Sequence, residues 1–169
     1  IASLPLSGLS GGAQPVMGFN YGAKQYGRVK ESIRFISGLG CIYGLATWLL
    51  VMLCPRQLIG IFSSDPQTIE VGARMLNIYF FGFFFMSMQF AGQSTFVALG
   101  KSRQAVFFSL LRKAFIVFPL TLLLPRWFAV DGVFLAEPIS NVIGGVACFA
   151  TMAATIFPML RREEAKKHL

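Results

Sequence analysis

The sequence predicts an all-α integral membrane protein, and three observations carry that prediction. Hydrophobic residues make up 55% of the 169 residues and charged residues only 13%, whereas soluble domains carry about a quarter charged residues. Apolar runs of the length that crosses a bilayer as a helix, about 20 residues, recur along the chain. Basic residues gather between these runs, so the net charge of +8 indicates membrane boundaries and not a nucleic-acid surface.

Five spans are expected, one weak and four strong. The weak span covers residues 1–20 and is diluted by serine, glutamine and glycine. The strong spans are expected over residues 33–54, 76–99, 106–124 and 133–159. Together they predict one transmembrane bundle over residues 1–160, followed by a basic tail over residues 161–169.

Two connections have their own signals. Asp65 followed by Pro66 predicts a helix start, with the aspartate as N-cap and the proline at the first helical position. The third helix is therefore expected to begin well before its lipid-buried part. Residues 126–132 predict a short turn between the fourth and fifth spans.

The basic residues predict an orientation. Twelve of the fifteen Lys and Arg residues fall in three stretches that alternating spans bring to one side: 24–34, 101–113 and 161–167. The positive-inside rule makes that side cytoplasmic, with the C-terminus there as well. We expect the cytoplasmic membrane of a bacterial cell.

Polar side chains inside spans are costly and therefore indicate function. Gln89 and Gln93 lie four residues apart on one helical face, where they either line a cavity or bond to a neighbouring helix. Both interpretations stay open. The residues expected to line a cavity are Gln14, Asn20, Gln89, Gln93, Glu137 and Asn141.

Glu137 is the only acidic residue inside an expected span. A charged side chain at a helix centre costs about 2.5–3.5 kcal/mol. Glu137 is either a group that takes up and releases protons or a carboxylate that reaches the outer interface or pairs with Arg126. Asn141 follows one turn later on the same face. Prolines inside spans are expected to act as hinges, although static membrane helices also contain them: Pro15, Pro119 and Pro138.

Glycines in G-x-x-x-G spacing predict close helix packing. The pairs are Gly8 with Gly12, Gly18 with Gly22, and Gly40 with Gly44. Packing inside one bundle is the favoured interpretation, and a dimer face is the alternative.

Motifs of enzymes are missing from the sequence. It contains no H-E-x-x-H, G-x-S-x-G, Walker or C-x-x-C pattern. The three cysteines lie within or at the ends of apolar runs and are interpreted as small packing residues. We expect no enzyme, no catalytic or metal-ligating residue and no cofactor.

Three segments resemble the multidrug and toxic compound extrusion (MATE) transporters. They are residues 12–30, with Gln14, Pro15 and Asn20; residues 98–103, Ala-Leu-Gly-Lys-Ser-Arg; and residues 132–141, with Glu137, Pro138 and Asn141. The resemblance covers nearly the whole chain. It implies a twelve-helix, two-lobe transporter of which this chain is the eighth to twelfth helices, so we expect a piece of a longer polypeptide.

The resemblance also implies a function. It is export of amphipathic cationic drugs or metabolites in exchange for Na⁺ or H⁺ by alternating access. The implied partners are the lipid bilayer, small organic cations and the N-terminal lobe of the same polypeptide, with no nucleic acid. Where some relatives have an acidic residue in the tenth helix this chain has Gln89 and Gln93, and Asn141 stands where many have aspartate.

Two alternative functions stay open. A flippase for lipid-linked saccharides shares the two-lobe design but requires a cationic cavity for pyrophosphate, and no span is expected to have a central Lys or Arg. A membrane scaffold without transport activity is the third alternative.

Overall fold

The computed structural model describes residues 2–167, and every regular element in that range is helical. Ile1 of the first expected span and residues 168–169 of the expected tail lie outside the described residues. The elements in chain order are α1 (Leu4–Gly22), α2 (Tyr26–Leu53), α3 (Pro55–Gly60), α4 (Pro66–Phe80), α5 (Phe83–Ala98), α6 (Ser102–Leu110), the π-helix η1 (Leu111–Val117), α7 (Phe118–Leu123) and α8 (Pro125–Lys167).

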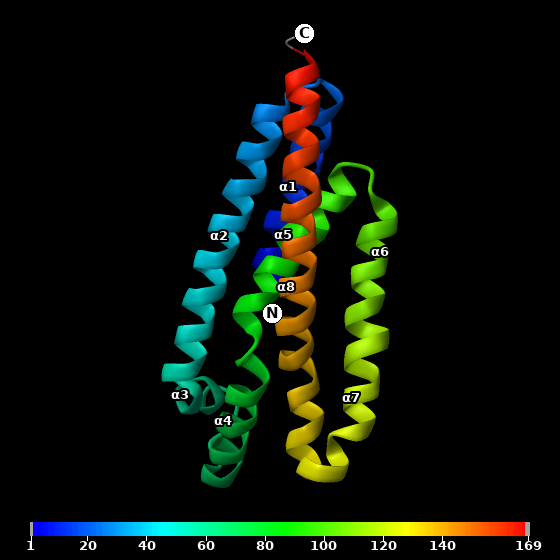
Figure 1. The fold of residues 1–169 in the computed structure, drawn as a ribbon. Helices are drawn as coiled ribbons and strands as arrows, with labels where there is room; N and C mark the ends of the chain where they lie inside the picture. Colours follow the sequence, from blue (N-terminus) through cyan, green and yellow to red (C-terminus); the bar gives the residue numbers. More distant parts are fainter. Residues whose placement is uncertain (1, 168–169) are drawn as a thin grey trace.

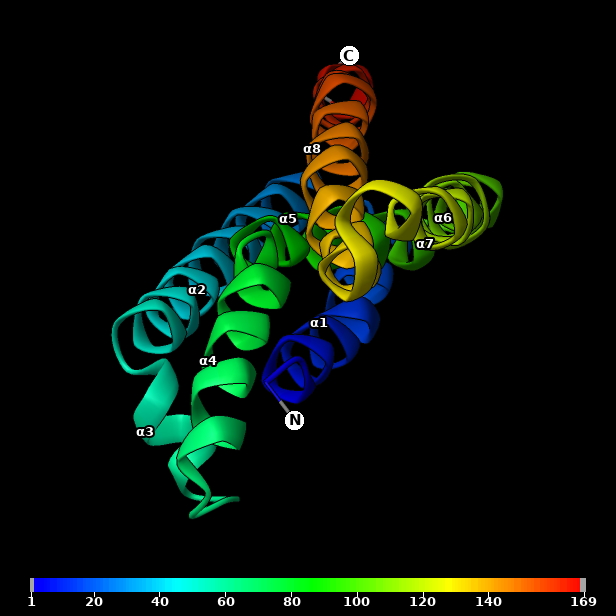
Figure 2. The same ribbon diagram turned by 90° about the horizontal axis from the view of Figure 1, so that it is seen from below.

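The helices form an elongated bundle (Figure 1). Helix α5 packs against α8, α2 and α1 and lies at the centre of the end-on view (Figure 2). Helices α6 and α7 extend on one side of the bundle and α3 and α4 on the other. The chain begins about half-way along the bundle and ends at one tip (Figure 1).

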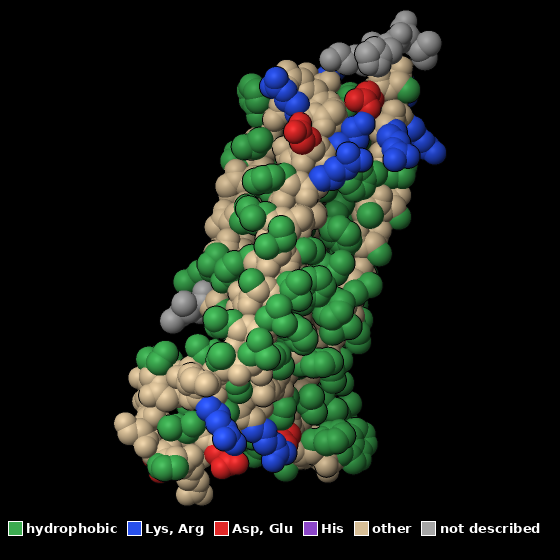
Figure 3. Space-filling model, turned by 90° about the vertical axis from the view of Figure 1, so that its left-hand side faces the viewer, with side chains coloured by type: hydrophobic (Ala, Val, Ile, Leu, Met, Phe, Trp, Pro, Cys, Tyr) green, Lys and Arg blue, Asp and Glu red, His purple; other side chains and the backbone are tan. Residues whose placement is uncertain are grey.

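Four stretches of the described chain are long and apolar enough to cross a membrane: Tyr26–Leu53, Pro66–Ala98, Ser102–Leu123 and Pro125–Lys166. Helix α1 is not among them, in keeping with the weak first span. Figure 3 shows one face of the molecule, where a belt of hydrophobic side chains separates charged groups at the two ends. That distribution fits a protein surrounded by lipid.

The third span is interrupted, which the sequence did not predict. Helix α4 begins at Pro66, and Asp65 caps it by accepting a hydrogen bond from the Thr68 backbone N–H at 2.9 Å, so the expected early helix start is confirmed. Helix α4 ends at Phe80, and α5 restarts at Phe83. Gly82 in the break lies against α8, because a Cβ there would be 2.7 Å from the Pro138 Cα. A side chain at this position would push α5 and α8 apart.

The fourth and fifth spans also differ in detail from the expected helices. The fourth contains the π-helix η1 between α6 and α7. The chain then reverses at Ala129, whose φ of 48° and ψ of −129° interrupt the helical backbone of α8. The reversal lies inside the expected turn over residues 126–132, but helical turns flank it on both sides.

The apolar core lies where α1, α2, α5 and α8 meet. Phe96 is fully buried and stacks on Phe108 of α6, with ring centroids 5.9 Å apart. The glycine pairs divide in their packing. Gly44 packs on α5, where a Cβ would lie 3.2 Å from the Ser87 Oγ, whereas Cβ atoms at Gly8 and Gly12 would meet nothing within 4 Å. The expected close packing therefore holds for α2 and is wrong for this face of α1.

Candidate functional site

Two basic residues lie in the middle of the fourth span. Arg112 and Lys113 belong to η1 and stand near the midpoint of the apolar stretch Ser102–Leu123. Pro119 follows η1; it lacks an N–H, and its ring crowds the carbonyl four residues earlier. A π-helical turn is wider than an α-helical turn and recurs at functional sites. It brings two consecutive side chains within reach of one acceptor group.

Helix α8 supplies the opposing face. Glu137, Asn141 and Gly144 follow one another at spacings of four and three residues, so they share one side of the helix. Asn141 is buried, with 2% of its surface exposed. A Cβ at Gly144 would lie 3.3 Å from the Arg112 Cγ, so the glycine makes room for the arginine stem.

These residues form a connected ionic cluster, called here the Arg112 cluster: Arg112, Lys113, Glu137 and Asn141. Arg112 Nη1 donates to the Asn141 Oδ1 at 2.6 Å and to the Glu137 Oε1 at 3.3 Å. Lys113 Nζ donates to both Glu137 carboxylate oxygens, each at 3.2 Å. The side chains of Arg112 and Glu137 are 13% and 16% exposed, whereas that of Lys113 is 55% exposed. One carboxylate thus holds two cations, of which only Lys113 is widely accessible.

Gln89 and Gln93 of α5 border the same cluster. They line a small cavity of about 30 Å³ together with Met86, Phe90 and Arg112. Gln93 Nε2 donates to the Ala105 carbonyl at 3.5 Å. The buried Gln89 Oε1 has no hydrogen-bond partner within the described part of the chain. An acceptor without a partner therefore lies next to a guanidinium.

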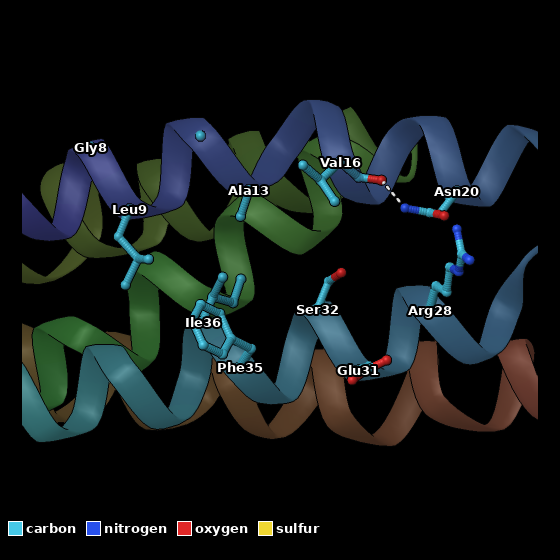
Figure 4. Close-up of a pocket in the computed structure, with 11 residues that line it drawn as sticks. Gly8, Leu9, Ala13, Val16, Asn20, Arg28, Glu31, Ser32, Phe35 and Ile36 are labelled. Carbon is cyan, nitrogen blue, oxygen red and sulfur yellow. Dashed lines mark hydrogen bonds between the residues drawn. The ribbon is translucent and has the colours of Figure 1, made fainter.

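Two of the expected cavity residues lie elsewhere. Asn20 lines a groove of about 600 Å³ between α1 and α2 and donates to the Val16 carbonyl at 2.8 Å (Figure 4). The groove is apolar around Leu9 and Phe35 and has Arg28 at its polar end (Figure 4). Gln14 is half-buried on α1 and is not among the residues that line the groove or the small cavity. Gln89, Gln93, Glu137 and Asn141 come together around Arg112.

Sequence reasoning misassigned Arg112 and Lys113. It counted them with the cytoplasmic basic residues, although both lie within residues 106–124, the expected fourth span. The statement that no span has a central Lys or Arg is therefore wrong, and so is the pairing of Glu137 with Arg126, because Arg112 and Lys113 pair with it. The signal that finds them is their position, well inside an apolar run that carries a single carboxylate opposite.

The three expected hinge prolines have different surroundings. Pro15 is exposed on α1, which continues through it as one helix. Pro119 follows η1, and the buried Pro138 lies against the break between α4 and α5 at Gly82. Only the latter two accompany an irregular backbone.

The fold and the Arg112 cluster define a multi-pass membrane protein with ionisable groups in its interior, as is typical of transporters. A family comparison matches residues 1–123 to MatE, and the chain belongs to this family of multidrug and toxic compound extrusion transporters. Sequence comparison with curated proteins found no match.

Solved structures share the fold. The chain is 31% identical to the MATE multidrug transporter DinF-BH, solved in complex with rhodamine 6G, with a TM-score of 0.84 over 91% of this chain and 34% of that one. It is 21% identical to the Vibrio cholerae MATE transporter VcmN in the bent form, with a TM-score of 0.81 over 97% and 36% of the two chains. The chain spans about a third of the length of these transporters.

Proposed function

We propose that this chain is part of the C-terminal lobe of a cation-coupled antiporter, driven by Na⁺ or H⁺, that exports amphipathic cationic drugs or metabolites. The observation that carries the proposal is the Arg112 cluster, a carboxylate between two cations inside the bundle of a MATE protein. Ionisable residues at such depth are costly and mark ion and substrate pathways. Coupling then acts through the charge of Glu137.

A change in that charge has a direct structural consequence. When Glu137 is protonated, its hydrogen bonds to Lys113 and Arg112 lose their charge-assisted character, which makes such bonds about twice as strong as neutral ones. Arg112 keeps Asn141 as an acceptor, but Lys113 loses the carboxylate that held it. Uptake of a proton, or of a cation that competes for the carboxylate, therefore frees the accessible member of the cluster.

The proposed setting is the cytoplasmic membrane of a bacterial cell, with the C-terminus in the cytoplasm and the N-terminal lobe on the same polypeptide. Basic residues at the end of the bundle where α2 begins and α8 ends support this orientation. Arg112 and Lys113 no longer contribute to the count, but the stretches around residues 24–34 and 161–166 remain.

Transport of rhodamine 6G into everted vesicles that contain the full-length transporter tests the proposal. Uptake should require a pH or Na⁺ gradient, and the double substitution Glu137→Gln with Gln89→Ala should reduce it. Glu163→Gln with Gln104→Ala makes the same chemical changes at the chain end and on an exposed face of α6, and should leave uptake unchanged. Unchanged transport in the first double variant removes the cluster from the mechanism, and flux without any gradient dependence contradicts antiport.

A lipid-linked saccharide flippase is a second candidate, because Arg112 and Lys113 provide the cationic interior that this function requires. Translocation of a lipid-linked saccharide in proteoliposomes, without rhodamine 6G uptake, would favour it. The absence of flux for both compounds would favour a scaffold.

A further inference from the structure

We infer that Lys113 and Arg112 form a binding site for the anionic group of an amphipathic solute, a carboxylate, sulfonate or phosphate monoester, and that Glu137 is the internal anion this group displaces. The inference rests on the proposed transport function for the solute's passage, but not for its binding. It widens the substrate class from cations to amphipaths that carry an acidic group.

The first support is the charge of the cluster. Two cations share one carboxylate, so the cluster carries one uncompensated positive charge in the apolar interior. The other carboxylates of the described chain lie in connections and toward helix ends, where Asp131 pairs with Arg74 and Glu164 with Lys30. An anion that reaches the Arg112 cluster therefore lowers the cost of holding that charge in the membrane.

Accessibility gives the site a direction. Exposure rises from 2% at Asn141 to 55% at Lys113, so the ammonium lies at the mouth and the guanidinium behind it. Large apolar side chains of the same helix are exposed around that position: Leu110, Phe115 and Phe118. A solute with an acidic group and an aromatic body matches this combination of one charge and exposed rings.

The two cations also have donors to spare. An ammonium has three N–H donors and a guanidinium five. Lys113 donates only to Glu137, and Arg112 uses Nη1 alone for its contacts, as far as the described residues go. A second carboxylate or a phosphate can accept from the remaining N–H groups in the charge-assisted geometry that arginine favours.

Gln89 makes the displacement of Glu137 feasible. Its unpartnered Oε1 borders the cavity of about 30 Å³ that Arg112 also lines. That volume is close to the share of one water molecule in the liquid. A water there, or a small turn of the guanidinium, gives Arg112 a replacement acceptor while Glu137 moves away.

A matched pair of probes tests the site. Dansyl-glycine carries a carboxylate, and dansyl amide is its neutral counterpart. Their binding is measured to the full-length transporter in phosphatidylcholine nanodiscs without an ion gradient. The wild type should bind the acid about tenfold more tightly than the amide, as expected for one charge-assisted hydrogen bond. Lys113→Met should bring the ratio close to one, and Glu137→Gln should tighten binding of the acid without changing that of the amide.

Arg103→Met is the matched control, because it removes a cation from the exposed start of α6 and should leave the ratio unchanged. Equal affinity for the two probes in the wild type overturns the inference and assigns the counter-charge to another part of the polypeptide or to a neutral Lys113. An unchanged ratio in Lys113→Met overturns it as well. Since binding is read without transport, either outcome leaves the rhodamine 6G test of antiport intact.

Discussion

The contacts of α5 with its neighbours differ between two regions. In one, which we call the dry core, Phe96 and Thr95 of α5 are fully buried near Met17 of α1, and Gly92 meets Cys148 of α8. In the other, Gln89 and Gln93 border the Arg112 cluster, where η1 and α8 are joined by ionic hydrogen bonds. The dry core is held by shape, which allows one arrangement, whereas the cluster has partners that can exchange. The first suits a scaffold and the second a moving part.

The largest effect is expected in the dry core. Phe96→Ala should lower the free energy of unfolding by about 3–5 kcal/mol, because it leaves a cavity among fully buried side chains. Unfolding in mixed micelles measures the loss. Phe115→Ala is the control, since 71% of that ring is exposed. Equal losses in the two variants would contradict the existence of a distinct dry core.

A smaller loss of stability is expected at the cluster. Arg112→Met should lower the free energy of unfolding by about 1.5–3 kcal/mol, the range for a hydrogen bond to a charged group. It leaves Asn141 without its guanidinium partner and Glu137 with Lys113 alone. The double variant Arg112→Met with Glu137→Gln should lose less than the sum of the single variants, because it leaves no unpaired buried charge. Strict additivity would show that the two residues do not interact.

The helix break provides a third contrast. Gly82→Ala should destabilise by about 1–3 kcal/mol through overpacking, because the new Cβ would lie against the Pro138 backbone. Gly38→Ala is the matched control in the open middle of α2, where alanine should stabilise by about 0.5–1 kcal/mol. The same unfolding assay measures both variants. A neutral Gly82→Ala would mean that α5 and α8 can separate freely at this point.

The smallest effect is expected at the start of α4, outside both regions. Hydrogen bonds from the Thr68 side chain and backbone lower the pKa of Asp65 below its usual value of 3.8. A lowered pKa in the folded state means that the cap stabilises fully above the unfolded value and fails as the pH falls through the folded value. Hydrogen exchange of the Thr68 amide should therefore accelerate at acidic pH, and Asp65→Ala should remove this dependence. An unchanged profile in Asp65→Ala would rule out the cap as its cause.

The elements that local sequence determines were predicted well. The cap at Asp65 and the proline after it depend on four consecutive residues, and the long apolar runs depend on composition over about 20 residues. The polar character of Gln89, Gln93, Glu137 and Asn141 also marked them as candidates. Their proximity is consistent with the expected cavity, whereas Gln14 and Asn20 lie on a different helix pair.

What the tertiary structure alone decided is the partner of each charge. Arg112 and Glu137 are 25 positions apart, and only the reversal at Ala129 brings η1 beside α8. A count of basic residues treats every cation as if it were solvated at an interface, and therefore assigned Arg112 to the cytoplasm. Helix boundaries follow from short-range backbone and solvation preferences, which the sequence carries by itself. The pairing of buried charges depends on distances across the fold, because electrostatic attraction is strong where water is excluded.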